Sequence, residues 1–279
     1  MADIAISAAQ VKALREASGM GMMECKKALL ACDGDFDSAQ DWLRVKSGAK
    51  ADKVASRQAS EGKIAFASHN GVGVLVEVSC ETDFVARDEN IAAFASAVAN
   101  AVAAAGSIPN DINTLPLANG QNAEEMRQNM VMKLGENISI RNVKAISTSN
   151  STTDSNIAAY IHSGDKIAAM CTINGDIELG RDICMHIAAM QPRYLNTESV
   201  PENVIARERD VFTQQAVESG KSAEMAEKIV AGKLNKHLAE ITLMQQPFVK
   251  DTEQTIAQVL KKADASITAF ELLIVGAAS

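Results

Sequence analysis

Four carboxylates lie close together in the sequence, at Glu77, Glu81, Asp83 and Asp88. Paired carboxylates can exchange protons with a substrate or hold a cation. No nucleophile or companion base is identifiable beside them, so their spacing alone does not predict a catalytic site. We interpret them as solvated acids of one loop, of which one could contact a partner.

A second candidate for chemistry is the pair Cys184 and His186 in a segment that predicts a helix. Residues two apart point to different faces of a helix, which disfavours a metal site or a Cys–His dyad. We interpret His186 as packed in a seam between helix and sheet. The chain also lacks the GxxxxGK[ST], GxSxG and HExxH motifs, so a binding protein is favoured over an enzyme.

The third candidate is Phe84, in the stretch "SCETDFVARDEN". It stands between Asp83 and Val85, where a polar turn should follow the apolar run of residues 72–78. Either Phe84 folds back onto its own core, or it is a probe for a pocket on another protein. Full burial of a phenylalanine contributes roughly 1.5–3 kcal/mol, which can drive such an insertion. An adjacent carboxylate would carry negative charge into that pocket.

Composition limits the class of protein. The chain has 279 residues, of which 47% are apolar, enough for roughly two domains with substantial cores. Its net charge of −8 makes it a poor general binder of nucleic acid or anionic membranes. We interpret Lys46, Lys50, Lys53 and Arg57 as part of a solvated linker rather than as a phosphate-binding patch.

The N-terminal segment, the apolar stretches and the cysteines indicate where in the cell the protein is expected. "MADIAISAAQ" is not a signal peptide, and no uninterrupted apolar stretch approaches the roughly 18 residues of a membrane span. Five scattered cysteines without a CxxC pair are typical of a reduced cytoplasmic protein.

The elements that must position these side chains begin with three short helices over residues 7–47. Ser7 with Gln10 predicts a capping box, and Asp35 predicts the cap of the third helix. A polar connector, partly helical, is expected over residues 46–63. Residues 63–79 then predict a β-hairpin around Asn70-Gly71, a strong hairpin turn signal.

A helix is expected at residues 89–105, an irregular segment at 107–122, a helix at 123–137, a strand at 138–147 and a polar loop at 148–156. The pattern then recurs: "IAFASHNG" (64–71) and "IAAYIHSG" (157–164) match at four positions with a shift of 93. Each copy leads into an apolar strand and a helix. We interpret this as a duplicated α+β unit, and chance similarity is the alternative.

Residues 201–220 and 222–242 predict two charged helices in an antiparallel hairpin. This hairpin interrupts the second copy, because strand-like sequence returns only at residues 267–276.

Several long motifs resemble the bacterial elongation factor Ts family. They span residues 1 to about 275 in the family's order: "SGMGMMECKKALLACDGDFDSA", "VEVSCETDFVARDENIAAFA", "KLGENISIRNV", "AYIHSG", "MHIAAMQP" and "LAEITLMQQPFV". The resemblance implies an α+β fold with a three-helix, UBA-like N-terminal module (1–54). It implies a core in two related halves with antiparallel strands (55–147 and 148–279), and a coiled-coil hairpin inserted at 200–241.

The resemblance implies a cytoplasmic guanine nucleotide exchange factor, not an enzyme, that binds elongation factor Tu in its GDP-bound and nucleotide-free forms. It implies no cofactor, no bound metal and no direct contact with nucleic acid or membrane, and it leaves open a homodimer or a 2:2 complex. Partner contacts are expected from three groups of residues: the loop Thr82, Asp83, Phe84 and Val85; the N-terminal Arg15, Met22, Met23 and Lys26; and His162 in the second half.

One departure from the family pattern lies at the C-terminus. Relatives commonly continue into a further helix, whereas this chain ends in "FELLIVGAAS", with Leu272 where an arginine is frequent. We expect weaker partner binding unless other surfaces compensate. Without the resemblance, a generic adaptor built on the three-helix module is the alternative function, and a thiol or metal enzyme comes third.

Overall fold

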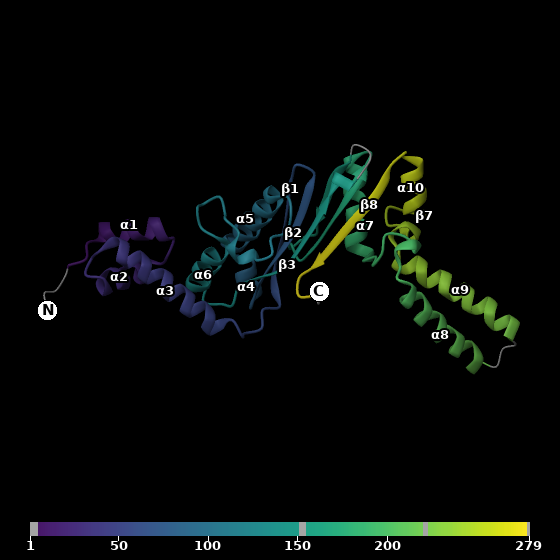
Figure 1. The fold of residues 1–279 in the computed structure, drawn as a ribbon, viewed down its shortest axis with the longest axis horizontal. Helices are drawn as coiled ribbons and strands as arrows, with labels where there is room; N and C mark the ends of the chain where they lie inside the picture. Colours follow the sequence, from purple (N-terminus) through teal and green to yellow (C-terminus); the bar gives the residue numbers. More distant parts are fainter. Residues whose placement is uncertain (1–4, 151–154, 220–222, 278–279) are drawn as a thin grey trace. The chain divides into compact units, whose positions relative to one another are not determined.

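The computed structural model describes residues 5–150, 155–219 and 223–277, and its fold is mixed α+β (Figure 1). In these ranges it has ten α-helices and three small sheets. The chain divides into two compact units. The first comprises Met1–Ala145, Ser163–Ile167 and Leu273–Ser279; the second comprises Ile146–His162 and Ala168–Leu272.

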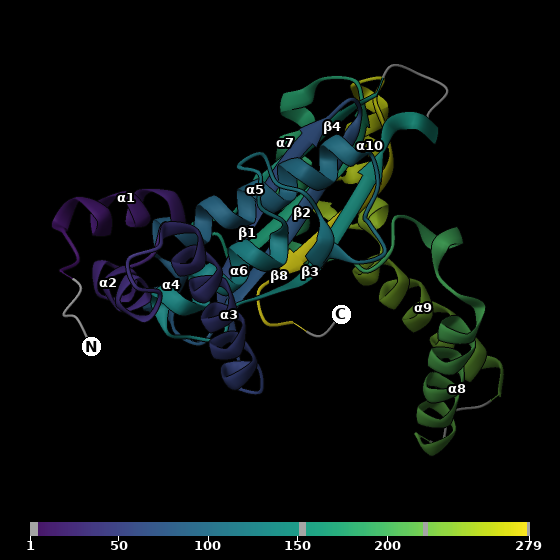
Figure 2. The same ribbon diagram turned by 60° about the vertical axis from the view of Figure 1, so that its left-hand side comes forward.

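The N-terminal helices begin where their caps predict. They are α1 (Ala8–Ser18), α2 (Met22–Ala31) and α3 (Phe36–Val54) (Figure 2). The capping box of Ser7 and Gln10 is present, and the Asp35 side chain caps α3. The three helices enclose a small core centred on Leu14, Leu29 and Leu43.

The expected connector is helical as far as Val54. Buried Ser47, Ala51 and Val54 explain this extension, because they continue the packed face of α3 toward α6 (Ala123–Leu134). Lys50 of this segment donates to the Met132 carbonyl at 2.8 Å, so it is not a purely solvated linker residue.

The predicted first hairpin is confirmed. Strands β1 (Glu61–His69) and β2 (Val72–Cys80) pair antiparallel, with His69 opposite Val72. Asn70 and Gly71 both adopt positive φ, 46° and 74°, as a two-residue primed turn requires. Strand β3 (Ser139–Ser147) completes a sheet of order β1-β2-β3.

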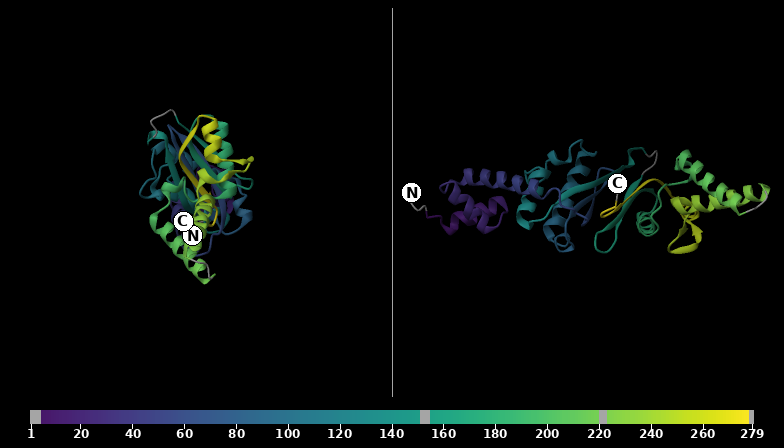
Figure 3. Two further views of the ribbon diagram at one scale, coloured as in Figure 1. Left: turned by 90° about the vertical axis from the view of Figure 1, so that its right-hand side faces the viewer. Right: turned by 90° about the horizontal axis from the view of Figure 1, so that it is seen from below.

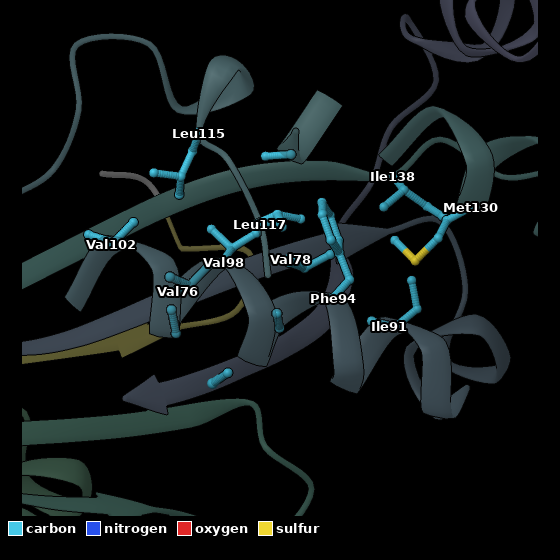
Figure 4. Packing of buried hydrophobic residues seen from close by; sticks show 14 of the residues in the cluster. Val76, Val78, Ile91, Phe94, Val98, Val102, Leu115, Leu117, Met130 and Ile138 are labelled. Carbon is cyan, nitrogen blue, oxygen red and sulfur yellow. The ribbon is translucent and has the colours of Figure 1, made fainter. Parts of the chain in front are cut away.

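Helix α5 (Glu89–Ala105) covers this first sheet and begins and ends where the sequence predicts. Gly106 ends it in the left-handed conformation. Its buried face, around Phe94 and Val98, packs on strand residues such as Val76 and Val78 (Figure 4). The short helix α4 (Asp83–Ala86) lies between β2 and α5 in the chain.

The second sheet repeats the order of the first. Strands β4 (Asn156–Ile161) and β5 (Ile167–Asn174) pair antiparallel, and β8 (Ser266–Ile274) joins β5. Helix α7 (Ile177–Met190) follows β5 and packs on β4, as α5 packs on β1. The connecting turn is longer here, since Ile161 pairs with Ala168. Residues 151–154 of the loop predicted at 148–156 lie outside the described residues.

Helices α8 (Glu202–Glu218) and α9 (Ala223–Ile241) pack along each other, as Figures 1 and 3 show. The turn predicted between them falls largely on residues 220–222, outside the described ranges. The sequence did not predict β6 (Pro247–Phe248), β7 (Asp251–Thr255) or α10 (Ile256–Lys262).

Single-turn 3₁₀ helices in the described ranges lie at Ile112–Thr114, Thr148–Asn150, Thr197–Ser199 and Leu243–Gln245. No helix in these ranges combines the length and the apolarity that crossing a bilayer requires.

Candidate functional site

Phe84 lies in a helical turn rather than in an irregular loop. Thr82 caps α4: its hydroxyl accepts from the Val85 amide at 3.3 Å, and its carbonyl accepts from the Ala86 amide at 3.0 Å. The Phe84 side chain is 81% exposed. Packing of Phe84 in its own core, one of the two alternatives, is therefore wrong.

The other side chains of α4 explain why Phe84 points outward. Ala86 is buried and Val85 packs against the core of the first unit. Asp83 accepts from Arg87 at 2.9 Å, one helical turn on. Successive residues of a helical turn face different directions, so burial of Val85 and Ala86 directs Phe84 toward solvent.

The base of this turn is held by Glu136, a residue outside the three groups of expected partner contacts. Its carboxylate accepts from the backbone amides of Glu81 and Thr82, both at 3.0 Å, and from the Thr82 hydroxyl at 2.6 Å. Glu136 follows Gly135, which ends α6 in the left-handed conformation. It lies 54 residues beyond Thr82, a separation that local pattern analysis does not bridge.

The interpretation of the four acids as solvated is wrong for Glu77. Glu77 lies within β2 and is fully buried, where it accepts hydrogen bonds from Ser79, Asn142 and the Gly276 amide. A polar group at an inward strand position needs such partners because it has lost water.

Glu81 and Asp88 also have structural partners. Glu81 accepts from the Asn137 amide at 2.6 Å and from Arg57 at 3.4 Å. Asp88 caps α5, and hydrogen bonds from the Asn90 side chain and amide lower the pKa of its carboxyl.

The N-terminal candidates form an exposed set on α2 and the last turn of α1. Met22 and Met23 are 61% and 65% exposed, and Arg15 and Lys26 are exposed as well. Met22 and Lys26 are one turn apart on α2 and share a face. Exposed methionines adapt their shape to an apolar partner surface at little cost in strain.

His162 directly follows β4 in the second unit and is exposed. One ring nitrogen lies 3.1 Å from the Tyr160 hydroxyl, a hydrogen bond that restrains the ring at the surface. Beside it, Ile161 is 37% exposed. The turn therefore presents a polar aromatic ring next to an apolar side chain.

Cys184 and His186 do not form a reactive pair. Cys184 is buried, with its sulfur 3.4 Å from that of Cys171, and this hydrogen bond together with burial raises the pKa of its thiol. His186 is also fully buried, and burial lowers its pKa. Its ring nitrogens contact Gln246 and Val249, and its ring centroid lies 6.0 Å from that of Phe248 in β6.

A metal centre has no support in the part of the chain that the structure describes. Within residues 5–150, 155–219 and 223–277, no three His, Cys, Asp or Glu side chains gather closely enough to hold an ion. The clustered acids near Phe84 are instead engaged with Arg87, Asn90 and Asn137.

Comparison with known proteins gives a consistent result. The family described as "Elongation factor TS" matches residues 81–277. Elongation factor Ts of Nitrosospira multiformis is 46% identical over 275 residues, which cover 97% of this chain and 90% of the relative. For Nitrosomonas eutropha the identity is 47%, with 97% and 92% covered, and for Chromobacterium violaceum it is 44%, with 97% and 92% covered. The chain belongs to the elongation factor Ts family.

Proposed function

We propose that this protein is a guanine nucleotide exchange factor for elongation factor Tu in translation elongation. Membership of the elongation factor Ts family supports the proposal. The single observation that carries the mechanism is Phe84, 81% exposed on a turn whose base is hydrogen-bonded to Glu136. Such a side chain suits insertion into another protein.

In the proposed mechanism the factor binds the GDP form of its partner and disturbs the region that holds Mg²⁺ and the phosphates. The affinity of a GTPase for GDP depends on the Mg²⁺ ion and on the phosphate loop. Only a difference in affinity between two partner conformations shifts nucleotide binding. Phe84 must therefore fit the nucleotide-free conformation better, with Thr82, Asp83 and Val85 in the same contact.

The energetics require more than one contact region. A 10⁴-fold change in affinity corresponds to about 5.5 kcal/mol, whereas one buried phenylalanine contributes roughly 1.5–3 kcal/mol. The exposed Arg15, Met22, Met23 and Lys26 supply a second region in the proposal. His162 supplies a third.

The architecture is proposed in the family's terms. Residues 1–54 form a UBA-like module, 55–147 and 148–279 form the two related halves of the core, and 200–241 form a coiled-coil hairpin inserted in the second half. The shared strand order of the two sheets supports a duplicated core.

The proposed setting is the bacterial cytoplasm, where elongation takes place. The factor performs no covalent chemistry and uses no cofactor, and it contacts neither nucleic acid nor membrane directly. A homodimer and a 2:2 complex with the partner both remain compatible with the proposal.

Phe84→Ala tests the mechanism. The fold should stay intact, because the side chain is exposed. The rate of GDP release should fall roughly 10- to 150-fold, the equivalent of about 1.5–3 kcal/mol of lost transition-state contact. Stopped-flow release of a fluorescent GDP from elongation factor Tu measures it, with Ile108→Ala, another exposed apolar truncation, as the control. An unchanged rate would remove Phe84 from the mechanism.

His162→Ala should act more mildly and through binding. Titration calorimetry with nucleotide-free elongation factor Tu should show weaker affinity, by severalfold, with the unfolding midpoint unchanged. Equal affinity would count against a contact by His162.

The same titration with added GDP separates exchange from simple adaptor binding, because coupling requires GDP to dissociate the complex.

A further inference from the structure

We propose that Glu136 is a positioning residue for the exchange reaction: it holds the turn that presents Phe84, without contacting the partner itself. The inference rests on the proposed function of Phe84. It starts from the geometry at the base of α4, where one carboxylate accepts three hydrogen bonds from two consecutive residues.

The carboxylate meets the chain where β2 ends and α4 begins. One oxygen accepts the amides of Glu81 and Thr82 at 3.0 Å each, and the other accepts the Thr82 hydroxyl at 2.6 Å. Hydrogen bonds to an ionised acceptor are roughly twice as strong as neutral ones. Glu136 is half-buried, so water competes with these bonds only in part.

The tie is reciprocal. The Glu81 carboxylate accepts the Asn137 amide at 2.6 Å, so residues 81–82 and 136–137 hold each other. The buried Asn137 side chain in turn donates to the carbonyls of Ala55 and Arg57, at 3.2 and 2.7 Å. The end of α3, the end of β2 and the start of β3 thus meet at one junction.

This junction matters because α4 cannot be rigid by itself. It has four residues, and a helix this short has too few internal hydrogen bonds to be stable alone. Thr82 is both the cap of α4 and the residue that Glu136 holds. Loss of the carboxylate therefore frees the cap and, with it, the direction in which Phe84 points.

When the Glu136 carboxylate is lost, we expect fewer molecules to hold Phe84 in the position that binds the partner. The Phe84 side chain itself remains able to make its contact. If the turn kept its native position in only about one-tenth of molecules, the apparent affinity of the factor for the transition state of GDP release would fall about tenfold. Glu136→Ala should have this effect. Glu136→Gln keeps one oxygen for the two amides and places an NH₂ group near the Thr82 hydroxyl, so it should restore exchange to within about threefold.

Hydrogen exchange of the free, full-length protein tests the positioning directly. In Glu136→Ala, peptides covering residues 80–88 should lose protection, while those covering α5 and residues 61–79 of the first hairpin keep theirs. Glu136→Gln should retain most of the protection. Asp182→Ala, which breaks an ion pair with Lys250 on the second unit, is the matched control and should leave residues 80–88 unchanged. Full protection of these residues in Glu136→Ala would overturn the proposal.

A double-mutant comparison links positioning to exchange. Release of fluorescent GDP should slow about tenfold in Glu136→Ala but much less when Glu136→Ala is added to Phe84→Ala, because most of the contact that Glu136 positions is then already lost. Equal slowing on both backgrounds would show that Glu136 acts independently and would overturn the positioning role. A normal rate in Phe84→Ala would instead remove Phe84 from the proposed mechanism, while hydrogen exchange still decides whether Glu136 orders the turn.

Discussion

At the scale of single residues, the buried polar groups of this chain serve as ties between distant segments. Glu77 holds the Gly276 amide, and His186 accepts from the Val249 amide at 3.3 Å while lying 2.9 Å from Gln246. Among the described residues, no buried side-chain nitrogen or oxygen lacks a hydrogen-bond partner. Because Val249 donates to Nδ1 of His186, the proton of the neutral ring belongs on Nε2, facing Gln246.

His186 should make stability depend on pH. Burial lowers its pKa below the ordinary 6.5, so between that lowered value and pH 6.5 the unfolded chain binds a proton that the native protein does not. The free energy of unfolding should be highest above pH 6.5 and fall as the pH decreases through this window. Urea unfolding at pH 7.5, 6.5 and 5.5 measures the slope.

The dependence of the free energy of unfolding on pH should disappear in His186→Gln, because glutamine does not titrate. This expectation holds whether or not the substitution changes stability at pH 7.5. The control is His69→Ala, a truncation at an exposed histidine at the end of β1, which should keep the slope. An unchanged slope in His186→Gln would assign the pH dependence to other groups.

At the scale of elements, the second unit depends on a close approach of α7 to its sheet. A Cβ added at Gly180 would lie 2.7 Å from the Ala158 Cβ and 2.9 Å from the Ile173 Cγ2. Helix α9 offers the opposite case, because a Cβ at Gly232 would meet nothing within 4 Å. Comparing alanine substitutions at Gly180 and Gly232 therefore separates the cost of overpacking from the gain in helix propensity.

Gly180→Ala should therefore destabilise the protein by about 1–3 kcal/mol, since overpacking outweighs the gain in helix propensity. Gly232→Ala should stabilise it by up to about 1 kcal/mol, because only the propensity changes. Chemical denaturation compares the two substitutions. Destabilisation by both, or by neither, would contradict this account of the α7–sheet contact.

At the scale of the whole molecule, the helical hairpin has its own packing. Val200, Leu234 and Leu238 form a small cluster with residues of α8 and α9. Phe212 of α8 stacks edge-on against His237 of α9, with ring centroids 6.2 Å apart. The segments that enter and leave the hairpin are joined, since the Arg193 and Tyr194 amides both donate to the Ile241 carbonyl. The hairpin can thus be shortened without separating its base.

Replacement of residues 210–237 by a short Gly-Ser linker should leave the sheet β1-β2-β3 and its helix α5 folded. The helical circular-dichroism signal should fall by the removed helix, while hydrogen-exchange protection of β1, β2 and α5 stays unchanged. These elements have their own core, centred on Phe94 and Val98. Loss of protection throughout the sheets would show that the hairpin supports the rest of the fold.

Much of the architecture can be predicted from the sequence, because the signals for helix caps, turns and helix ends are local. The capping box at Ser7, the positive φ demanded by Asn70-Gly71 and the glycine stop at Gly106 each act within a few residues. The short elements β6, β7 and α10 were missed because brief segments have little periodicity of their own and form by packing on neighbours.

The long helices, the first hairpin and the family motifs can be predicted from the sequence, and so can the two alternatives for Phe84. The exposure of Phe84, the burial of Glu77 and the hydrogen bonds of Glu136 to the turn follow from the tertiary fold and not from any local pattern. The physical reason is range: caps and turns are set by neighbours in the chain, whereas burial and hydrogen bonds between residues 54 or more positions apart depend on which surfaces folding brings together.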